Sequence, residues 1–506
     1  MNKYQKSFEN LLKKNEKIVT LNGILSLLNW DQETYLPPGA IDVRSHQVSE
    51  LTALIHKMKT QASFKNNLEE LINLKSGKIK TNKLTDIQKK TLELMREDYI
   101  KLSKIPSSFI HKISKHAALA VNAWADARKK NDYKIFSPYL EKIIDFNLQK
   151  AEYLGYEDHP YDALADQFES KMTVKKLHRF FAKLKPALKE ILDKIQKKQK
   201  PDTSFLNVPF PKDKQRALGN VLLDHLKLDS RYSRMDESAH PFSTGIHPKD
   251  VRITTRIQEN PLANIASILH EFGHGFYERN LPIEYFGSPI CDSTSLALHE
   301  SQSRFWEVFI GKSFSFWKFF YPFAQKYFAD ILENVSLQDF YKAANKVSPS
   351  FIRVDSDELT YCLHIILRFE LELEMLEKKV TVKDLPDAWN HKMKTYLGIT
   401  PKTNAEGCLQ DIHWSFGEFG YFPTYALGNV IAGQLFETYT SFNKSWEKDL
   451  ENGDLDPVKD WLKTNIHRHG RYYSMDEIVE MTTKKPLSIT AYIKYLNKKY
   501  SKIYNF

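Results

Sequence analysis

The residues best suited to chemistry are those of the segment His270-Glu271-Phe272-Gly273-His274. On a helix, residues four apart lie about 40° apart around the axis, so both imidazoles can reach one metal ion. Glu271 lies off their shared face, where a general base can act on a water molecule at that metal. The pattern is typical of a zinc-peptidase active site. The alternative is two histidines that fall four apart by chance.

The flanking sequence predicts a helix around this segment. Asn260 and Pro261 form an N-cap and first-turn pair, and Leu281-Pro282 ends the helix. Apolar residues recur between them with helical spacing: Ile265, Ile268, Leu269, Phe272 and Phe276. We therefore expect a buried helix that presents both histidines.

A catalytic zinc ion keeps three protein ligands and leaves a position for water, so one more ligand is expected. Glu300 lies in a second apolar helical segment, Leu296 to Ser301. It follows His274 by 26 residues, enough for the helix end, a loop and a return of the chain. Glu300 is the predicted third ligand. The alternatives are a ligand role for His299 and a solvent-exposed Glu300.

Composition indicates a helical protein with a large core. The 506 residues are 42% hydrophobic, which excludes disorder, and only 18 are glycine, which favours helices over a turn-rich β architecture. Residues 1–200 have the pattern of successive amphipathic helices, and residues 201–211 form a loop. No linker separates a second domain, so we expect one domain over residues 1–506.

One segment, residues 251–257, alternates with period two and predicts a strand just before the metal-binding helix. Val251, Ile253 and Ile257 would face the core, with Arg252 on the other face. Such a strand could pair with an extended peptide substrate by strand addition. The alternative is an ordinary edge strand with solvated arginines.

Charge and cysteine content narrow the function classes. The net charge is +10, but the lysines are dispersed among acids and apolar residues, so no nucleic-acid partner is expected. Three cysteines are too few for a disulfide framework and fit a reducing compartment. The charged N-terminus has the pattern of neither a signal peptide nor an anchor, and no membrane span is evident. We expect a cytoplasmic protein without a membrane partner.

Six ordered motifs resemble the carboxypeptidase Taq family of metallocarboxypeptidases, also called thermostable carboxypeptidase 1, over nearly the full length. The motifs are His240-Pro241-Phe242; Asp250-Val251-Arg252-Ile253-Thr254; His270 to His274; His299-Glu300-Ser301-Gln302; Ile352-Arg353-Val354-Asp355-Ser356-Asp357; and Gly407 to Trp414. The chain departs from the family pattern at Ser356, which takes an alanine position. One small residue replaces another there, so the departure casts little doubt.

The resemblance implies an all-α, mainly helical fold with a small β element beside the metal helix. It also implies two lobes, roughly residues 1–200 and a catalytic lobe of roughly 201–506, around a deep groove. It further implies one divalent metal per chain, zinc or cobalt, and a homodimer. The implied activity is removal of single C-terminal amino acids from peptides with broad specificity.

The resemblance also supplies candidates for binding the substrate. Arg353 matches the residue expected to hold the terminal carboxylate, which a guanidinium binds bidentately. The alternative for Arg353 is an ion pair with Asp355, Asp357 or Glu358. Arg252 is an auxiliary or groove-limiting cation, and His240 is a groove or scaffold residue.

Further candidates would bond the substrate carbonyl or the developing oxyanion. They are Gln410, His413 and one of Tyr421 and Tyr425, between which the sequence does not choose. Two other functions stay open. One is a zinc oligopeptidase or dipeptidyl-carboxypeptidase of related helical fold. The other is a catalytically idle scaffold or nucleic-acid-binding protein that uses the metal for structure.

Overall fold

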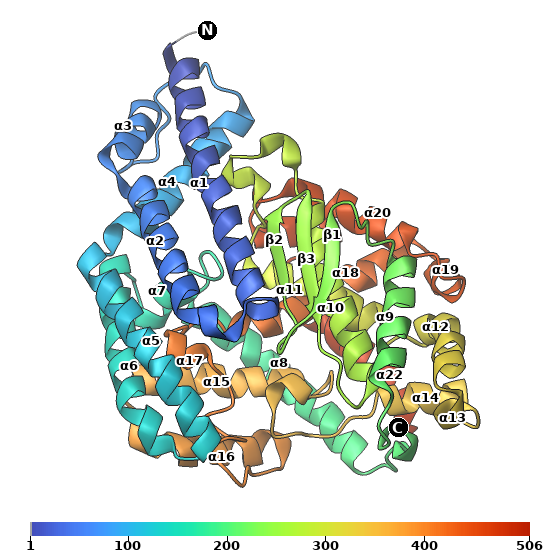
Figure 1. Cartoon of the computed structure of the whole chain (residues 1–506). Helices are drawn as coiled ribbons and strands as arrows, with labels where there is room; N and C mark the ends of the chain where they lie inside the picture. Colours follow the sequence, from blue (N-terminus) through green and yellow to red (C-terminus); the bar gives the residue numbers. More distant parts are fainter. Residues whose placement is uncertain (1–2) are drawn as a thin grey trace.

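Helices dominate residues 3–506, which are the residues that the computed structural model describes (Figure 1). The first part of the chain consists of α1 (Lys3–Thr34), η1 (Pro38–Ala40), α2 (Ile41–Thr60), α3 (Ala62–Leu71), α4 (Asp86–Lys104), α5 (Ser107–Lys130), α6 (Tyr133–Leu154), α7 (Pro160–Ala165) and α8 (Val174–Gln196). This confirms the succession of helices predicted for residues 1–200. Of the charged N-terminus, Met1 and Asn2 lie outside the described residues.

The second part places a small sheet before the remaining helices. It contains η2 (Ser204–Leu206), α9 (Lys212–Leu226), β1 (Ser233–Glu237), β2 (Ser243–His247), β3 (Asp250–Thr255), α10 (Pro261–Arg279), η3 (Ile283–Tyr285), η4 (Pro289–Cys291), α11 (Leu296–Arg304) and η5 (Phe305–Ile310), a π-helical turn. The helices that follow are α12 (Phe314–Tyr327), α13 (Ala329–Leu332), α14 (Leu337–Ala344), η6 (Arg353–Asp355), α15 (Tyr361–Leu376), η7 (Val382–Asp384) and α16 (Leu385–Leu397). The chain ends with α17 (His413–Phe416), α18 (Pro423–Phe442), α19 (Trp446–Glu451), α20 (Asp456–Asn465), η8 (His467–His469), α21 (Met475–Thr483) and α22 (Thr490–Tyr504).

The sheet has the strand order β1-β3-β2, with β3 parallel to β1 and antiparallel to β2. Val251 and Ile253 of β3 are buried against Gly275 of α10. The predicted strand is thus confirmed, although it ends at Thr255. The predicted strand addition to it is wrong, and so is the edge-strand alternative. Both edges of β3 are already paired, so no backbone groups remain for a peptide.

The described residues form two separate hydrophobic cores. The smaller core joins α1, α2, α3 and α4, where Leu11, Leu68 and Leu92 are fully buried. The larger core holds α10, α11, α15 and α18, with Trp306 and Ile366 fully buried. The helix with the two histidines therefore belongs to the larger core.

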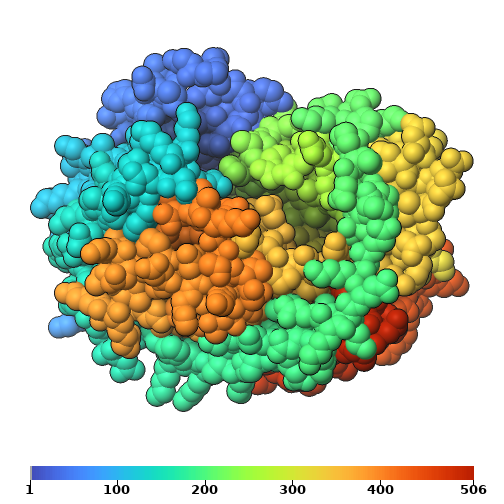
Figure 2. All heavy atoms as spheres, turned by 90° about the horizontal axis from the view of Figure 1, so that it is seen from below, coloured from blue at the N-terminus to red at the C-terminus, as the bar shows by residue number. Residues whose placement is uncertain are grey.

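Open space lies between these two cores and on the underside of the molecule. A cavity of about 560 Å³ is lined by α1 and α4 on one side and by His247, Glu278 and Asp292 on the other. Seen from below, the surface is hollowed between the lime-green sheet region and the orange segments of the C-terminal half (Figure 2). Among residues 3–506, no helix is both long and apolar enough to span a membrane.

Candidate metal centre

The helix predicted around His270 and His274 is confirmed as α10. The Asn260 side chain accepts a hydrogen bond from the Leu262 backbone N–H, and Pro261 occupies the first turn. One face of α10 is buried in the larger core. His270 and His274 lie one turn apart, with ring centroids 4.9 Å from each other.

Two glycines allow the neighbouring helices to approach closely enough to form a site. A Cβ at Gly273 of α10 would lie 2.5 Å from the Gln302 carbonyl oxygen of α11. A Cβ at Gly428 of α18 would lie 2.6 Å from Cγ of Glu300. Real side chains do not approach so closely, so glycine at both positions lets α11 and Glu300 pack between α10 and α18.

Glu300 meets both histidines in this packed arrangement. Its Oε2 atom lies 3.5 Å from Nε2 of His274 and 3.9 Å from Nε2 of His270. One possible ligand atom from each of the three residues lies within 4.8 Å of the others. Glu300 is only 6% exposed, so its carboxylate is held inside the protein beside the imidazoles.

Arg304 and Glu307 support these three residues. Oε2 of Glu307 lies 2.8 Å from Nδ1 of His270. Arg304 donates from Nε to Oε1 of Glu300 at 2.8 Å and from Nη1 to Oε2 of Glu307 at 3.0 Å. The motifs predicted neither supporting role. The spacing of four and seven residues from Glu300 places both on its helical face, and this signal could have identified them. We call these five residues, His270, His274, Glu300, Arg304 and Glu307, the metal cluster.

The surroundings of the two histidines raise the pKa of His270 and lower the pKa of His274. Burial opposes protonation of His270, but the carboxylates of Glu300 and Glu307 raise its pKa to about 9. Burial and the neighbouring His299 lower the pKa of His274 to about 3. Burial would raise the pKa of Glu300, but Arg304 and His270 hold it well below its usual range. At neutral pH the metal-free cluster therefore holds one exchangeable proton, on His270.

Glu271 lies in a different electrostatic environment. Its side chain is buried, with 5% of the residue exposed. Burial raises the pKa of Glu271 to about 7, helped by the negative charge of Glu300. A carboxyl group with this pKa can both accept and release a proton near neutral pH.

His299 packs beside the metal cluster and has a different partner. Its Nε2 atom lies 2.7 Å from Oε1 of Glu278. Its ring stacks on that of His274, with centroids 4.5 Å apart. One of the two ring nitrogens of His299 is thus already paired with a carboxylate.

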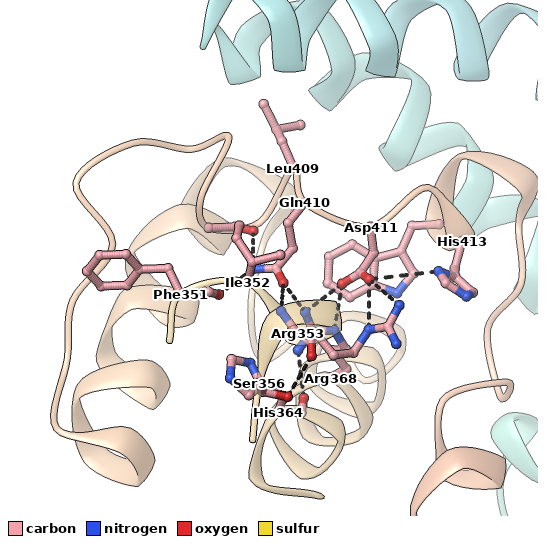
Figure 3. Close-up of polar contacts among 12 residues, drawn as sticks. Phe351, Ile352, Arg353, Ser356, His364, Arg368, Leu409, Gln410, Asp411 and His413 are labelled. Atoms are coloured by element: carbon pink, nitrogen blue, oxygen red, sulfur yellow. Dashed lines mark hydrogen bonds and ion pairs between the residues drawn. The ribbon is translucent and has the colours of Figure 1, made fainter. Parts of the chain in front are cut away.

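Arg353 lies in a buried cluster assembled from three segments (Figure 3). Its guanidinium donates to Oδ1 of Asp411 at 2.9 Å and to the Tyr361 hydroxyl at 3.2 Å. Arg368, which is fully buried, donates to the other oxygen of Asp411 at 2.6 Å. The ion-pair partner of Arg353 is therefore Asp411, and not one of the nearby acids considered from the sequence.

Gln410 and His413 complete this group, which we call the arginine cluster: Arg353, Arg368, Gln410, Asp411 and His413. Oε1 of Gln410 accepts from the Arg353 backbone N–H at 2.8 Å and from Arg368 at 2.7 Å. Its amide nitrogen donates to the carbonyl oxygens of Phe351 and Glu406. Both the oxygen and the nitrogen of the Gln410 side-chain amide are therefore hydrogen-bonded within the protein.

The two candidate tyrosines lie beside the arginine cluster. Nε2 of His413 lies 3.3 Å from the Tyr425 hydroxyl, and the rings of Tyr421 and Tyr425 have centroids 5.2 Å apart. Arg353 is positioned over the Tyr425 ring at 5.0 Å. Burial and the positive charge of Arg353 lower the pKa of His413 to about 3, so its imidazole is neutral.

Arg252 and His240 occupy the sheet region. Arg252 pairs with Asp250 at 2.9 Å and lies over the Trp30 ring at 4.3 Å. The contact with Trp30 joins β3 to the end of α1. His240 is exposed in the connection between β1 and β2, where its carbonyl oxygen accepts from the Ser238 hydroxyl at 2.6 Å.

Comparison with known proteins shows which family the chain belongs to. Residues 10–500 match the family model described as carboxypeptidase Taq (M32) metallopeptidase. The chain belongs to this family. It is 39% identical to carboxypeptidase 1 of Bacillus subtilis over 503 residues, which is 99% of each chain. It is also 38% identical to thermostable carboxypeptidase 1 of Thermus thermophilus, over 98% of this chain and 99% of that one.

Solved structures of carboxypeptidases are also similar to this chain. The M32 carboxypeptidase from Deinococcus radiodurans superimposes with a TM-score of 0.95 at 36% identity, covering 99% of this chain and all of that one. The Pyrococcus furiosus carboxypeptidase gives 0.94 at 33% identity over 99% of each chain. The protein is therefore a metallocarboxypeptidase, a hydrolase with the helical fold of its family, and membership of this metallopeptidase family implies a divalent metal.

Proposed function

We propose that His270, His274 and Glu300 hold one divalent metal ion, with zinc as the first choice and cobalt as the alternative. The observation that carries this proposal is the convergence of one donor atom from each residue within 4.8 Å. Two imidazoles and a carboxylate are a donor set that suits zinc. The contact of Glu307 with His270 adds support, because a carboxylate on the second ring nitrogen orients a histidine ligand.

A metal ion in this position would lower the pKa of a coordinated water molecule and polarise the scissile carbonyl group. The Glu271 carboxylate would accept the proton of that water and then deliver it to the nitrogen of the leaving amine. In the metal-free protein, burial already raises the pKa of Glu271 to about 7, above that of an ordinary carboxyl group, which favours its acceptance of a proton. We therefore assign Glu271 as the general base and general acid.

Arg353 would bind the terminal carboxylate of the peptide. Its contacts with Asp411 and Tyr361 use three of its five N–H groups. One N–H then remains on each of Nη1 and Nη2, and these two would donate to the substrate carboxylate. Fixing the carboxylate at one distance from the scissile bond would limit the reaction to removal of single C-terminal residues, with broad specificity for their side chains.

The remaining candidate residues are proposed to assist the reaction or to shape the groove. His413 and one of Tyr421 and Tyr425 would donate to the substrate carbonyl or the oxyanion, with Tyr425 favoured by its contact with His413. Gln410 would position Arg353 from the protein side. Arg252 would limit the groove from its place against Trp30, and His240 would line the groove entrance.

The test is the product pattern from a library of synthetic peptides, analysed by mass spectrometry with and without added zinc or cobalt. We expect single residues to be removed from free C-termini only when metal is present. Release of dipeptides, or equal cleavage of peptides with amidated C-termini, would favour the oligopeptidase alternative. Metal-independent cleavage would remove His270, His274 and Glu300 from the mechanism.

Further proposals concern the state of the protein in the cell. We propose a cytoplasmic homodimer in which each chain is one domain, with an N-terminal lobe of roughly residues 1–200 and a catalytic lobe of roughly 201–506. The separate core of α1 to α4 supports an N-terminal lobe, although α5 to α8 of the same lobe pack into the larger core. Peptides are the proposed partners, and no nucleic-acid partner is proposed. Light scattering of the full chain would test the dimer.

A further inference from the structure

The two carboxylate oxygens of Glu300 have different partners. Oε2 faces the Nε2 atoms of His270 and His274 at 3.9 and 3.5 Å, with the Ser303 hydroxyl 3.3 Å away. Oε1 accepts a hydrogen bond from Nε of Arg304 at 2.8 Å. One oxygen is thus directed at the proposed metal position, and the other is paired with a cation.

Arg304 is itself held from two further directions. Its Nη1 atom donates to Oε2 of Glu307 at 3.0 Å, and its guanidinium carbon lies 4.0 Å from the centre of the Tyr361 ring. Only 11% of the Arg304 side chain is exposed. A planar guanidinium fixed by two carboxylates and an aromatic face has little freedom to release either carboxylate.

We infer that Arg304 is a positioning residue that keeps Oε1 of Glu300 away from the metal, so that Glu300 offers a single oxygen. A carboxylate can coordinate a metal through one oxygen or through both. A catalytic zinc site with three protein ligands must keep one position open for water, and a second carboxylate oxygen would compete for that position. Arg304 therefore protects the position of the reacting water without contacting substrate.

The same side chain reaches the other end of the metal cluster. By holding Glu307, which contacts Nδ1 of His270, Arg304 fixes the orientation of a second proposed ligand. Lysine carries the same charge on a single ammonium group, and it lacks the planar fork that joins two carboxylates. The inference rests on the proposed metal site and adds to it a reason for arginine at this position.

The experiment uses the full-length protein loaded with cobalt(II) in three forms: unmodified, Arg304→Gln and Arg304→Lys. Visible absorption and X-ray absorption measure the number of oxygen ligands, and chelator competition measures metal affinity. Arg128→Gln is the control, because Arg128 is partly buried and also lies over an aromatic ring, that of Trp124 at 5.6 Å, but it belongs to α5. Melting temperatures separate an altered site from lost folding.

We expect Arg304→Gln to retain cobalt, gain an oxygen ligand and lose about tenfold to hundredfold in kcat/KM, the range for residues that orient metal ligands. Arg304→Lys should show a smaller change in the same direction, and it replaces Arg304→Gln as the test if the latter does not fold. Arg128→Gln should match the unmodified protein. Identical spectra in the unmodified, Gln and Lys forms would overturn the inference.

A different result would overturn the proposed metal site instead. The unmodified protein would then bind no cobalt, or His274→Ala would leave its cobalt spectrum unchanged. If His274→Ala alters the spectrum and neither Arg304 variant does, the metal site stands and only the role of Arg304 fails.

Discussion

The metal cluster and the arginine cluster have opposite charge balances. In the metal cluster, the carboxylates of Glu300 and Glu307 surround the single guanidinium of Arg304. In the arginine cluster, the guanidiniums of Arg353 and Arg368 surround the single carboxylate of Asp411. In the metal-free protein the proton on His270 balances the one excess negative charge of the first arrangement, and a metal cation could take the place of that proton. The second arrangement leaves an excess of positive charge for an anion.

The two clusters are joined through one aromatic ring. Arg304 lies over the face of Tyr361, and Arg353 donates to the Tyr361 hydroxyl. A cation site and an anion site are thus held at a fixed separation by a buried side chain. In the proposed function, which places the peptide bond at the metal and the terminal carboxylate at Arg353, this separation would define where the chain is cut.

The largest expected effect comes from removing a ligand of the proposed metal site. His274→Ala and Glu300→Ala should each lose most of the bound metal, and activity should fall to the background rate, because two protein ligands do not retain a catalytic ion. Metal analysis after dialysis, beside peptide hydrolysis, checks this. Full metal occupancy in Glu300→Ala would direct attention to His299 or Glu307 as the third ligand.

A smaller loss is expected when the metal cluster stays intact and only the base is removed. Glu271→Gln should retain its metal and lose roughly 10²–10⁴-fold in kcat, the range for general acid–base catalysis. Glu284→Gln, at an exposed carboxylate in η3, is the control and should behave as the unmodified protein. Near-normal turnover by Glu271→Gln would exclude the general-base assignment.

The proposed role of the arginine cluster is tested by changing the C-terminal group of the peptide substrate. A hydrogen bond to a charged group contributes about 1.5–3 kcal/mol, so peptides with free C-termini should be cleaved roughly tenfold to hundredfold faster than amidated ones. Arg353→Ala should remove most of that difference and leave the metal bound. Arg231→Ala, at an exposed arginine, should preserve it. If Arg353→Ala kept the same preference for free over amidated C-termini, another cation would have to bind the terminal carboxylate of the substrate.

The most gradual expected effect is the pH dependence of metal binding. In the metal-free protein the pKa of His270 is raised to about 9, so below that pH an incoming metal must displace a proton from it. Affinity should therefore fall about tenfold for each pH unit below 9 and level off above it. Calorimetry in buffers of different ionisation enthalpy would measure the proton released. Binding without proton release at pH 7 would contradict the charge balance described for the metal cluster.

Local patterns in the sequence predicted the first cluster far better than the second. The helix that carries His270 and His274, and the helix that carries Glu300, follow from capping residues and apolar spacing. The role of Gly428 follows from no such pattern, because it depends on which helix packs against Glu300. The sequence gives the period of a helix, and it does not give its neighbours.

The arginine cluster shows the same limit at longer range. Arg353 and Asp411 lie 58 residues apart, and their ion pair depends on how η6 packs against the segment before α17. Sequence proximity suggested Asp355, Asp357 or Glu358 instead. The strand at residues 251–257 was similarly predicted from its alternation, but its central place in the sheet was not, since strand order depends on tertiary pairing.

The contact between Glu300 and Gly428 has a kinetic consequence. Because the Glu300 side chain packs on α18 and its carboxylate is already paired with Arg304, its conformation is set before any ion arrives. The metal-free protein should therefore stay folded, and metal uptake should need no slow rearrangement of the chain. The exchange of one metal for another would then be governed by the release and hydration of the ions themselves.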